Sequence, residues 1–142
     1  MTAAKKVQRT PLTVDRYMTP APQTIGKAQK LETAHEMMRR HDIRHLPVLD
    51  GGKLVGILSD RDLRLVEALK DVDPKLVPVE EAMSLEVFQV APNAALETVV
   101  REMMRKKYGS AVVVDGEDVV GIFTAIDALE ALAWLIEQYD AN

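Results

Sequence analysis

The sequence predicts an α/β (α+β) fold in which two β-α-β-β-α repeats pack with pseudo-twofold symmetry. The main observation is an internal duplication: a shift of 65 residues, without gaps, gives 13 identities over the 51 positions that align 15–65 with 80–130. Average residue usage would give roughly 3 identities by chance. Helical and strand patterns also recur in the same order in both copies. Two copies are too few for a solenoid, so they favour a pair of packed subdomains.

Each copy contains a short strand, a helix, a β-hairpin and a second helix. The hairpin turns are Asp50-Gly51-Gly52 and Asp115-Gly116-Glu117, whose residue types favour tight turns between strands. The expected elements are 22–25, 30–41, 45–49, 53–58 and 60–71 in the first copy, and 87–90, 95–107, 110–114, 118–123 and 125–138 in the second.

Prolines separate the two copies. Asp73-Pro74 and Val77-Pro78 interrupt the regular patterns and predict a linker over 72–79. We therefore expect a flexible tail at 1–10, a first domain at 11–75 and a second domain with a C-terminal helix at 76–142.

Composition excludes several classes of protein. The 142 residues carry a net charge of −4 and no cysteine, which excludes disulfides, thiolate metal sites and cysteine nucleophiles. The longest apolar run, 131–136, is too short to span a membrane, and the N-terminus lacks the apolar stretch of a signal peptide, so a cytoplasmic protein is expected. An acidic chain also argues against binding to nucleic acid.

Charge is divided unequally between the two halves. Residues 1–71 have a net charge of +4 and residues 72–142 a net charge of −8. This difference could favour packing between halves, within one chain or across a dimer, or it could reflect a solvated surface of uneven composition.

A polar motif follows the last strand of each copy. Ser59 and Asp62 follow Gly56, and Thr124 and Asp127 follow Gly121 at the same spacing. A hydroxyl residue with an acid three positions later is typical of a helix capping box. The same geometry suits a nucleotide, because free N–H groups at a helix start attract phosphate and a carboxylate can accept both ribose hydroxyls.

The duplicated motifs together resemble a tandem pair of cystathionine-β-synthase (CBS) domains, a Bateman module, over about residues 11–138. The residues that carry this resemblance are Asp15-Arg-Tyr-Met-Thr-Pro20, Ile43-Arg-His-Leu-Pro-Val48, the Asp50-Gly-Gly turn and the two Gly-x-x-Ser/Thr-x-x-Asp motifs. The resemblance implies two clefts between the copies that bind adenosine-containing ligands such as AMP, ADP or ATP. It also implies a flat homodimer and regulation of a partner protein.

The family pattern implies that each cleft combines residues from both copies. One cleft would join Thr124 and Asp127 to Ile43, Arg44, His45, Leu46 and Pro47. The other would join Ser59 and Asp62 to Tyr108, Gly109, Ser110, Ala111 and Val112.

The two clefts are expected to differ in charge. Arg44 and His45 would equip the Asp127 cleft to bind phosphate, whereas Gly109 and Ser110 offer the other cleft no charge. Lys106 and Lys107 could reach into a cleft or belong to a solvated helix face. His35, His41 and His45 do not have the spacing of a metal site.

The leading functional hypothesis is a non-catalytic regulatory module that needs no cofactor and binds an adenine nucleotide as its ligand. The alternative is a dimerisation module with vestigial clefts. An enzyme that uses Asp62 and Asp127 is disfavoured, because no nucleophile–base pair accompanies them. The last helix supplies the expected dimer contact, through Ala128, Leu132, Leu135 and Trp134.

Overall fold

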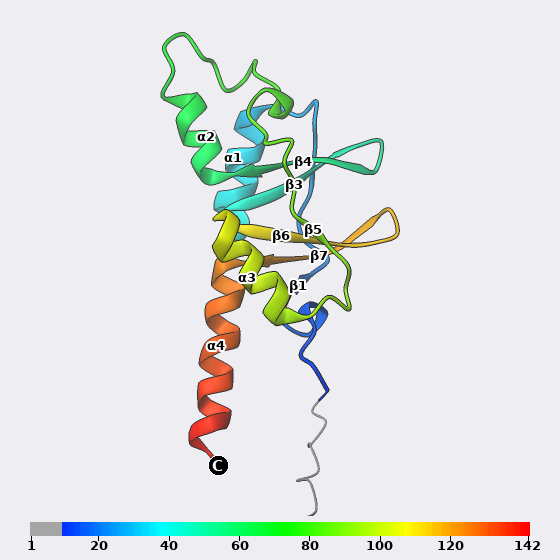
Figure 1. Ribbon diagram of the computed structural model, residues 1–142. Coiled ribbons are helices and arrows are strands. Elements are labelled where there is room, and N and C mark those ends of the chain that lie inside the picture. The colour runs from blue at the N-terminus through cyan, green and yellow to red at the C-terminus, as the bar shows by residue number, and fades with distance from the viewer. Residues whose placement is uncertain (1–9) are drawn as a thin grey trace, which may run out of the picture.

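Residues 10–142 form two similar α/β units in the computed structural model (Figure 1). The expected flexible tail therefore lies almost entirely outside the described residues. The elements of the first unit are β2 (Ile25–Gly26), α1 (Leu31–His41), β3 (His45–Asp50), β4 (Lys53–Ser59) and α2 (Asp60–Glu67). Those of the second are β5 (Gln89–Val90), α3 (Leu96–Lys106), β6 (Ser110–Asp115), β7 (Asp118–Thr124) and α4 (Ala125–Asp140). The predicted pair of β-α-β-β-α repeats is confirmed.

Each unit is built on a small mixed sheet. The first sheet has the strand order β2-β3-β4, and the second has the order β1-β7-β6-β5, where β1 is Thr19–Pro20. In each unit the short first strand is parallel to the first hairpin strand, and the two hairpin strands are antiparallel. The helices lie on one side, and both hairpin turns project away on the other (Figure 1).

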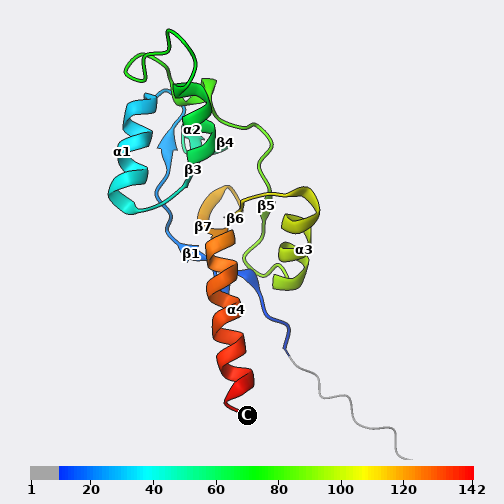
Figure 2. The same ribbon diagram turned by 90° about the vertical axis from the view of Figure 1, so that its left-hand side faces the viewer.

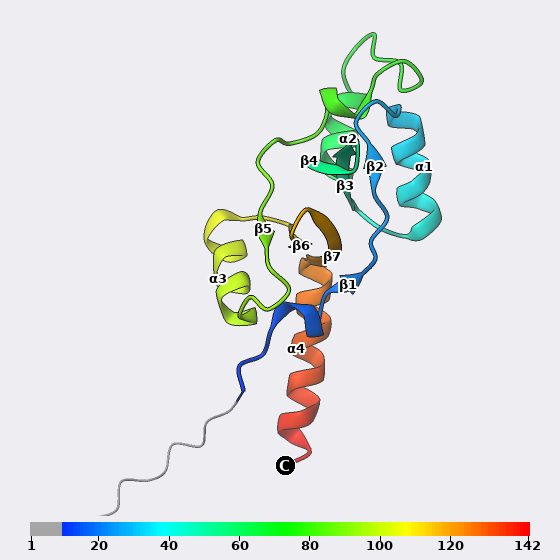
Figure 3. The same ribbon diagram turned by 90° about the vertical axis from the view of Figure 1, so that its right-hand side faces the viewer.

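A segment before each unit packs onto the other unit. We call residues 12–20 and 77–84 the lead-in segments. β1 pairs with β7, through Thr19 opposite Ile122 and Pro20 opposite Gly121. The second lead-in segment contains the 3₁₀ helix η2 (Val79–Glu81), and its Ser84 forms a bridge with Ile57 of β4. The lead-in segments therefore tie the two sheets together (Figure 3).

Each hydrophobic core includes one residue from the lead-in segment that packs onto it. Val14, in the 3₁₀ helix η1 (Val14–Arg16), is fully buried in the core of the second unit with Val99 and Phe123. Val79 is fully buried in the core of the first unit with Leu31 and Leu58. Each core is thus completed by a segment that precedes the other unit in the sequence.

Gly56 and Gly121 permit the close approach of the lead-in segments. A Cβ built on Gly56 would lie 2.5 Å from the sulfur of Met83, and one on Gly121 would overlap the sulfur of Met18. A residue with a side chain at either position would displace the methionine, which explains why the two glycines occupy equivalent places.

In the first unit α1 and α2 lie side by side, whereas in the second unit α4 extends well beyond the sheet (Figure 2). α2 ends at Glu67 rather than at the expected residue 71, and α4 continues to Asp140. Past the end of α2, Asp71 has a φ of 67°, a left-handed conformation that does not belong to an α-helix. Within residues 10–142, no helix combines the length and apolarity needed to cross a bilayer.

Candidate functional site

The polar motif after each hairpin forms a complete capping box. The backbone N–H of Asp62 donates to Ser59 Oγ (3.0 Å), and the N–H of Ser59 donates to Asp62 Oδ2 (3.1 Å). Thr124 and Asp127 make the corresponding bonds at 3.2 and 2.9 Å. The capping prediction is confirmed, and each Asp is fixed at the start of its helix.

A cleft lies between the start of α2 and the start of β6. We call it the Asp62 cleft; its volume is about 280 Å³. Such a volume is near the lower end of the range of small-molecule sites. Its lining residues are His45, Ile57, Ser59, Asp62, Ser84, Glu86, Val87, Phe88, Lys107, Tyr108, Gly109, Ser110 and Val112.

The cleft brings together most of the residues that the sequence assigned to it. Ser59 and Asp62 of the first unit face residues 108–110 and Val112 of the second. Ala111 is an exception, because it is fully buried in the core of the second unit. Successive strand residues point to opposite faces of a sheet, so Ala111 points into the core while Ser110 and Val112 face the cleft.

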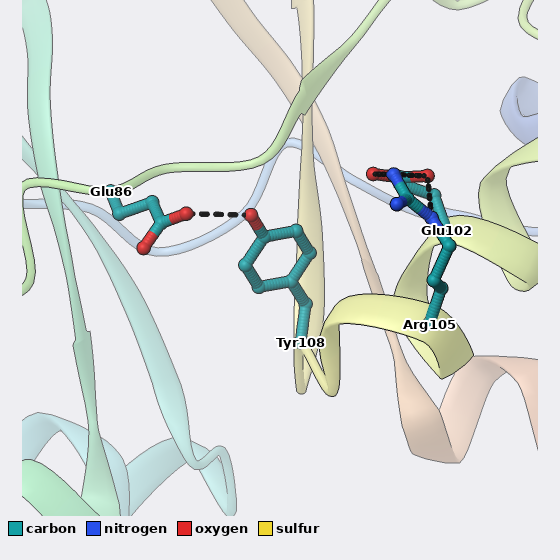
Figure 4. Close-up of polar contacts among 4 residues, drawn as sticks. All are labelled: Glu86, Glu102, Arg105 and Tyr108. Atoms are coloured by element: carbon teal, nitrogen blue, oxygen red, sulfur yellow. Dashed lines mark hydrogen bonds and ion pairs between the residues drawn. The ribbon is translucent and has the colours of Figure 1, made fainter.

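Three lining residues form an aromatic and acidic wall: Tyr108, which the sequence assigned to this cleft, and Glu86 and Phe88, which it did not. The rings of Phe88 and Tyr108 stack with their centroids 5.3 Å apart. The Tyr108 hydroxyl donates to Glu86 Oε1 at 2.9 Å (Figure 4). This hydrogen bond is the main reason why the pKa of the Tyr108 hydroxyl is raised, and desolvation raises it further. The 65-residue shift places Ser84 on Thr19, but no repeated pattern marks Glu86 or Phe88.

His45 lies in the Asp62 cleft, not in the Asp127 cleft to which the sequence assigned it. A Cβ on Gly109 would come within 2.9 Å of His45 Nε2, so the absence of a side chain at Gly109 makes room for the imidazole. Burial lowers the pKa of His45, and the charge of Arg44 lowers it further, whereas Asp62 and Asp60 partly oppose this shift. Near neutral pH His45 is therefore an uncharged hydrogen-bonding group.

Replacing His45 with glutamine should make stability less dependent on pH below neutrality. The lowered pKa means that the unfolded chain binds a proton more readily, so the free energy of unfolding of the wild type falls as pH drops below the ordinary value of 6.5 toward the folded-state pKa. Urea unfolding between about pH 5 and pH 7.5 should show a flatter profile for His45→Gln. The matched control is His41→Gln, an exposed position at the end of α1. Equal slopes for wild type and His45→Gln would contradict the assigned burial effect.

Asp127 has a different environment from Asp62. Thr19 Oγ1 donates to Asp127 Oδ1 at 3.0 Å, and the Thr124 hydroxyl donates to Oδ2 at 3.2 Å. Asp127 is only 9% exposed. It lines a separate hollow of about 340 Å³ formed with Arg16, Tyr17, Glu130, Ala131 and Trp134.

The expected partners of Asp127 in segment 43–47 make other contacts. Leu46 is buried in the core of the first unit, and Pro47 is also buried. Ile43 packs against the same core, whereas Arg44 is exposed and its carbonyl accepts the N–H of Asp60. Over residues 10–142, no hydrogen bond joins segment 43–47 to Thr124 or Asp127.

The histidines do not form a metal site in the described part of the chain. His35 Nδ1 lies 3.1 Å from Glu67 Oε1, which links α1 to α2. Residues 10–142 contain no group of three His, Cys, Asp or Glu side chains arranged to hold a metal ion.

Comparison with known families agrees with this architecture. A family model of the CBS domain matches the chain twice, over residues 14–68 and 79–133. The chain belongs to the CBS domain family. The two matches cover most of both units, so the chain is a CBS domain pair.

One curated protein and one solved structure are similar to the chain over most of their length. The chain is 32% identical over 105 residues to the CBS domain-containing protein YhcV of Bacillus subtilis, and the match covers 74% of both chains. A crystal structure of a putative acetoin utilization protein (AcuB) from Vibrio cholerae superposes with a TM-score of 0.83 at 32% identity, covering 94% of this chain and 98% of that one.

Two further structures contain ligands. The CBS domain pair of protein MJ0100, in complex with 5′-methylthioadenosine and S-adenosyl-L-methionine, has a TM-score of 0.76 and 26% identity, with coverage of 87% and 98%. CBSX2 in complex with AMP has a TM-score of 0.72 and 26% identity, with coverage of 87% and 97%.

Proposed function

We propose that this CBS pair is a non-catalytic regulatory module that binds an adenosine-containing ligand in the Asp62 cleft and signals to a partner protein. The observation that carries the proposal is the meeting of Ser59 and Asp62, at the start of α2, with Tyr108, Gly109 and Ser110 in one cleft. Both units contribute to this cleft, so a ligand there would influence how they pack.

The two Asp residues differ in their capacity to accept ribose hydroxyls. Within residues 10–142, Asp62 accepts one hydrogen bond, at Oδ2, and its Oδ1 is available. Both oxygens of Asp127 are already engaged by Thr19 and Thr124. Asp127 Oδ1 already accepts a bond from Thr19, whereas Asp62 Oδ1 accepts none among the described residues, so Asp62 has the greater spare capacity to accept ribose hydroxyls.

The ligands of two relatives support an adenosine class. MJ0100 is described with 5′-methylthioadenosine and S-adenosyl-L-methionine, and CBSX2 with AMP. These ligands share adenosine and differ at the 5′ position. Adenosine is accordingly the simplest ligand with which to test this chain.

Adenosine should raise the melting temperature of the protein in a concentration-dependent manner. A ligand at about 100 times its Kd stabilises the folded state by about 2.7 kcal/mol, which corresponds to several degrees in Tm for a domain of this size. A thermal-shift titration with adenosine and AMP, with ribose as control, measures this. An unchanged Tm at millimolar adenosine would contradict the proposal and favour the dimerisation module with vestigial clefts.

An exposed apolar face on α4 favours a homodimer as part of the same function. The side chains of Ile126, Leu129, Leu132 and Ile136 are 50–61% exposed and lie on one side of the helix. This set shares Leu132 with the contact expected from the sequence, and Trp134 is also exposed, although its ring contacts Tyr17. Ala128 packs on the core of the second unit and Leu135 is half-buried, so the proposed face does not include them. Light scattering should give twice the 15.8 kDa chain mass, and a monomer at high concentration would exclude this dimer.

A further inference from the structure

The Asp62 cleft contains a second carboxylate, Glu86, that has a neutral partner. Its Oε1 accepts the Tyr108 hydroxyl, and no ion pair to Glu86 occurs within the described range 10–142. Glu102, on the outer surface of α3, is by contrast held by Arg105 through bonds of 2.7 to 3.2 Å (Figure 4). Glu86 therefore has spare acceptor capacity on the wall of the cleft.

The groups beside Glu86 suit a planar aromatic ring. Phe88 and Tyr108 stack on each other and line the same cleft. Aromatic side chains bind nucleobases by stacking, and an acidic side chain can accept an exocyclic amino group of a base. Asp62 supplies a separate carboxylate acceptor that suits a ribose.

The other copy lacks all three of these groups. Under the 65-residue shift, Glu86, Phe88 and Tyr108 correspond to Ala21, Gln23 and Ile43. The duplication therefore does not explain the aromatic and acidic wall, which is specific to the Asp62 cleft.

We infer that Glu86 accepts an N–H of an exocyclic amino group on the ligand base, so that the Asp62 cleft selects a 6-aminopurine over a 6-oxopurine. This inference rests on the proposed function and adds a specificity-determining residue to it. A 6-oxo group presents an acceptor to an acceptor-only carboxylate, and neither oxygen atom can donate. A purine without a 6-substituent avoids that repulsion but gains no bond.

Calorimetric titration with adenosine, purine riboside and inosine separates these contributions, because the three nucleosides differ at the base alone. We expect the wild type to bind adenosine about 10- to 100-fold more tightly than purine riboside, the range for a hydrogen bond to a charged group. Inosine should bind most weakly. Glu86→Gln should weaken adenosine and strengthen inosine, because the glutamine amide can donate to the 6-oxo group.

The matched control is Glu102→Gln, which removes the same charge outside the cleft and should leave all three affinities unchanged. Melting temperatures of both variants, measured alongside, confirm that each is folded. The inference is overturned if wild type binds adenosine and purine riboside equally, if Glu86→Gln behaves like Glu102→Gln, or if inosine or guanosine is preferred. Failure to bind any nucleoside would overturn the proposed function as well, whereas tight adenosine binding without discrimination would remove only the role of Glu86.

Discussion

Replacing Val14 with aspartate should destabilise the second unit by about 4 kcal/mol, although Val14 precedes the first unit in the sequence. The side chain is fully buried in the core that contains Val99 and Phe123. The substitution removes apolar burial worth roughly 1.5 kcal/mol or more and adds a cost of a few kcal/mol for an unpaired carboxylate in that core. This loss is a large part of the total stability of a typical domain.

Urea unfolding followed by the fluorescence of Trp134 measures this effect, since the indole contacts Tyr17 beside the same core. Ala28→Asp is the control, because Ala28 is exposed in the turn between β2 and α1. We expect the control to change the free energy of unfolding by less than about 0.5 kcal/mol. A Val14→Asp protein as stable as the control would mean that the first lead-in segment does not belong to the second core.

The helices and strands could be predicted because the duplication presents each sequence pattern twice, once in each copy. Both hairpins and both capping boxes were anticipated, since turn residues and a hydroxyl three positions before an acid are local signals. The exchange of lead-in segments could not be anticipated in this way. β1 has only two residues, one of them Pro20, and its pairing with Gly121 of β7 is a long-range contact with no local signature.

The residues that meet in the Asp62 cleft were largely predictable, but which of the two clefts is better suited to a ligand was not. The meeting of Asp62 with Gly109 and Ser110 followed from the family resemblance. The position of the His45 side chain depends on free space beside Gly109, and the engagement of Asp127 depends on Thr19 reaching across from β1. Both are tertiary contacts between segments far apart in the sequence, so the expected preference for the Asp127 cleft rested on residue types alone.

Replacing Asp62 with alanine should weaken adenosine binding about 10- to 100-fold. The variant removes the carboxylate oxygen that is available to the ribose, and hydrogen bonds to a charged acceptor have this magnitude. Asp127→Ala is a closely matched control, because Asp127 has the same position in the capping box of α4. Both variants lose the bond from the N-cap N–H to the carboxylate, and Asp127→Ala also loses the bonds from the Thr19 and Thr124 hydroxyls. The melting temperatures of both variants therefore have to be measured to show that each is folded at the temperature of the titration.

Calorimetric titration of adenosine into wild type, Asp62→Ala and Asp127→Ala shows which of the two carboxylates binds the ligand. We expect Asp127→Ala to retain the affinity of the wild type and Asp62→Ala to lose most of it. Retained binding in Asp62→Ala together with its loss in Asp127→Ala would overturn the assignment of the ligand to the Asp62 cleft.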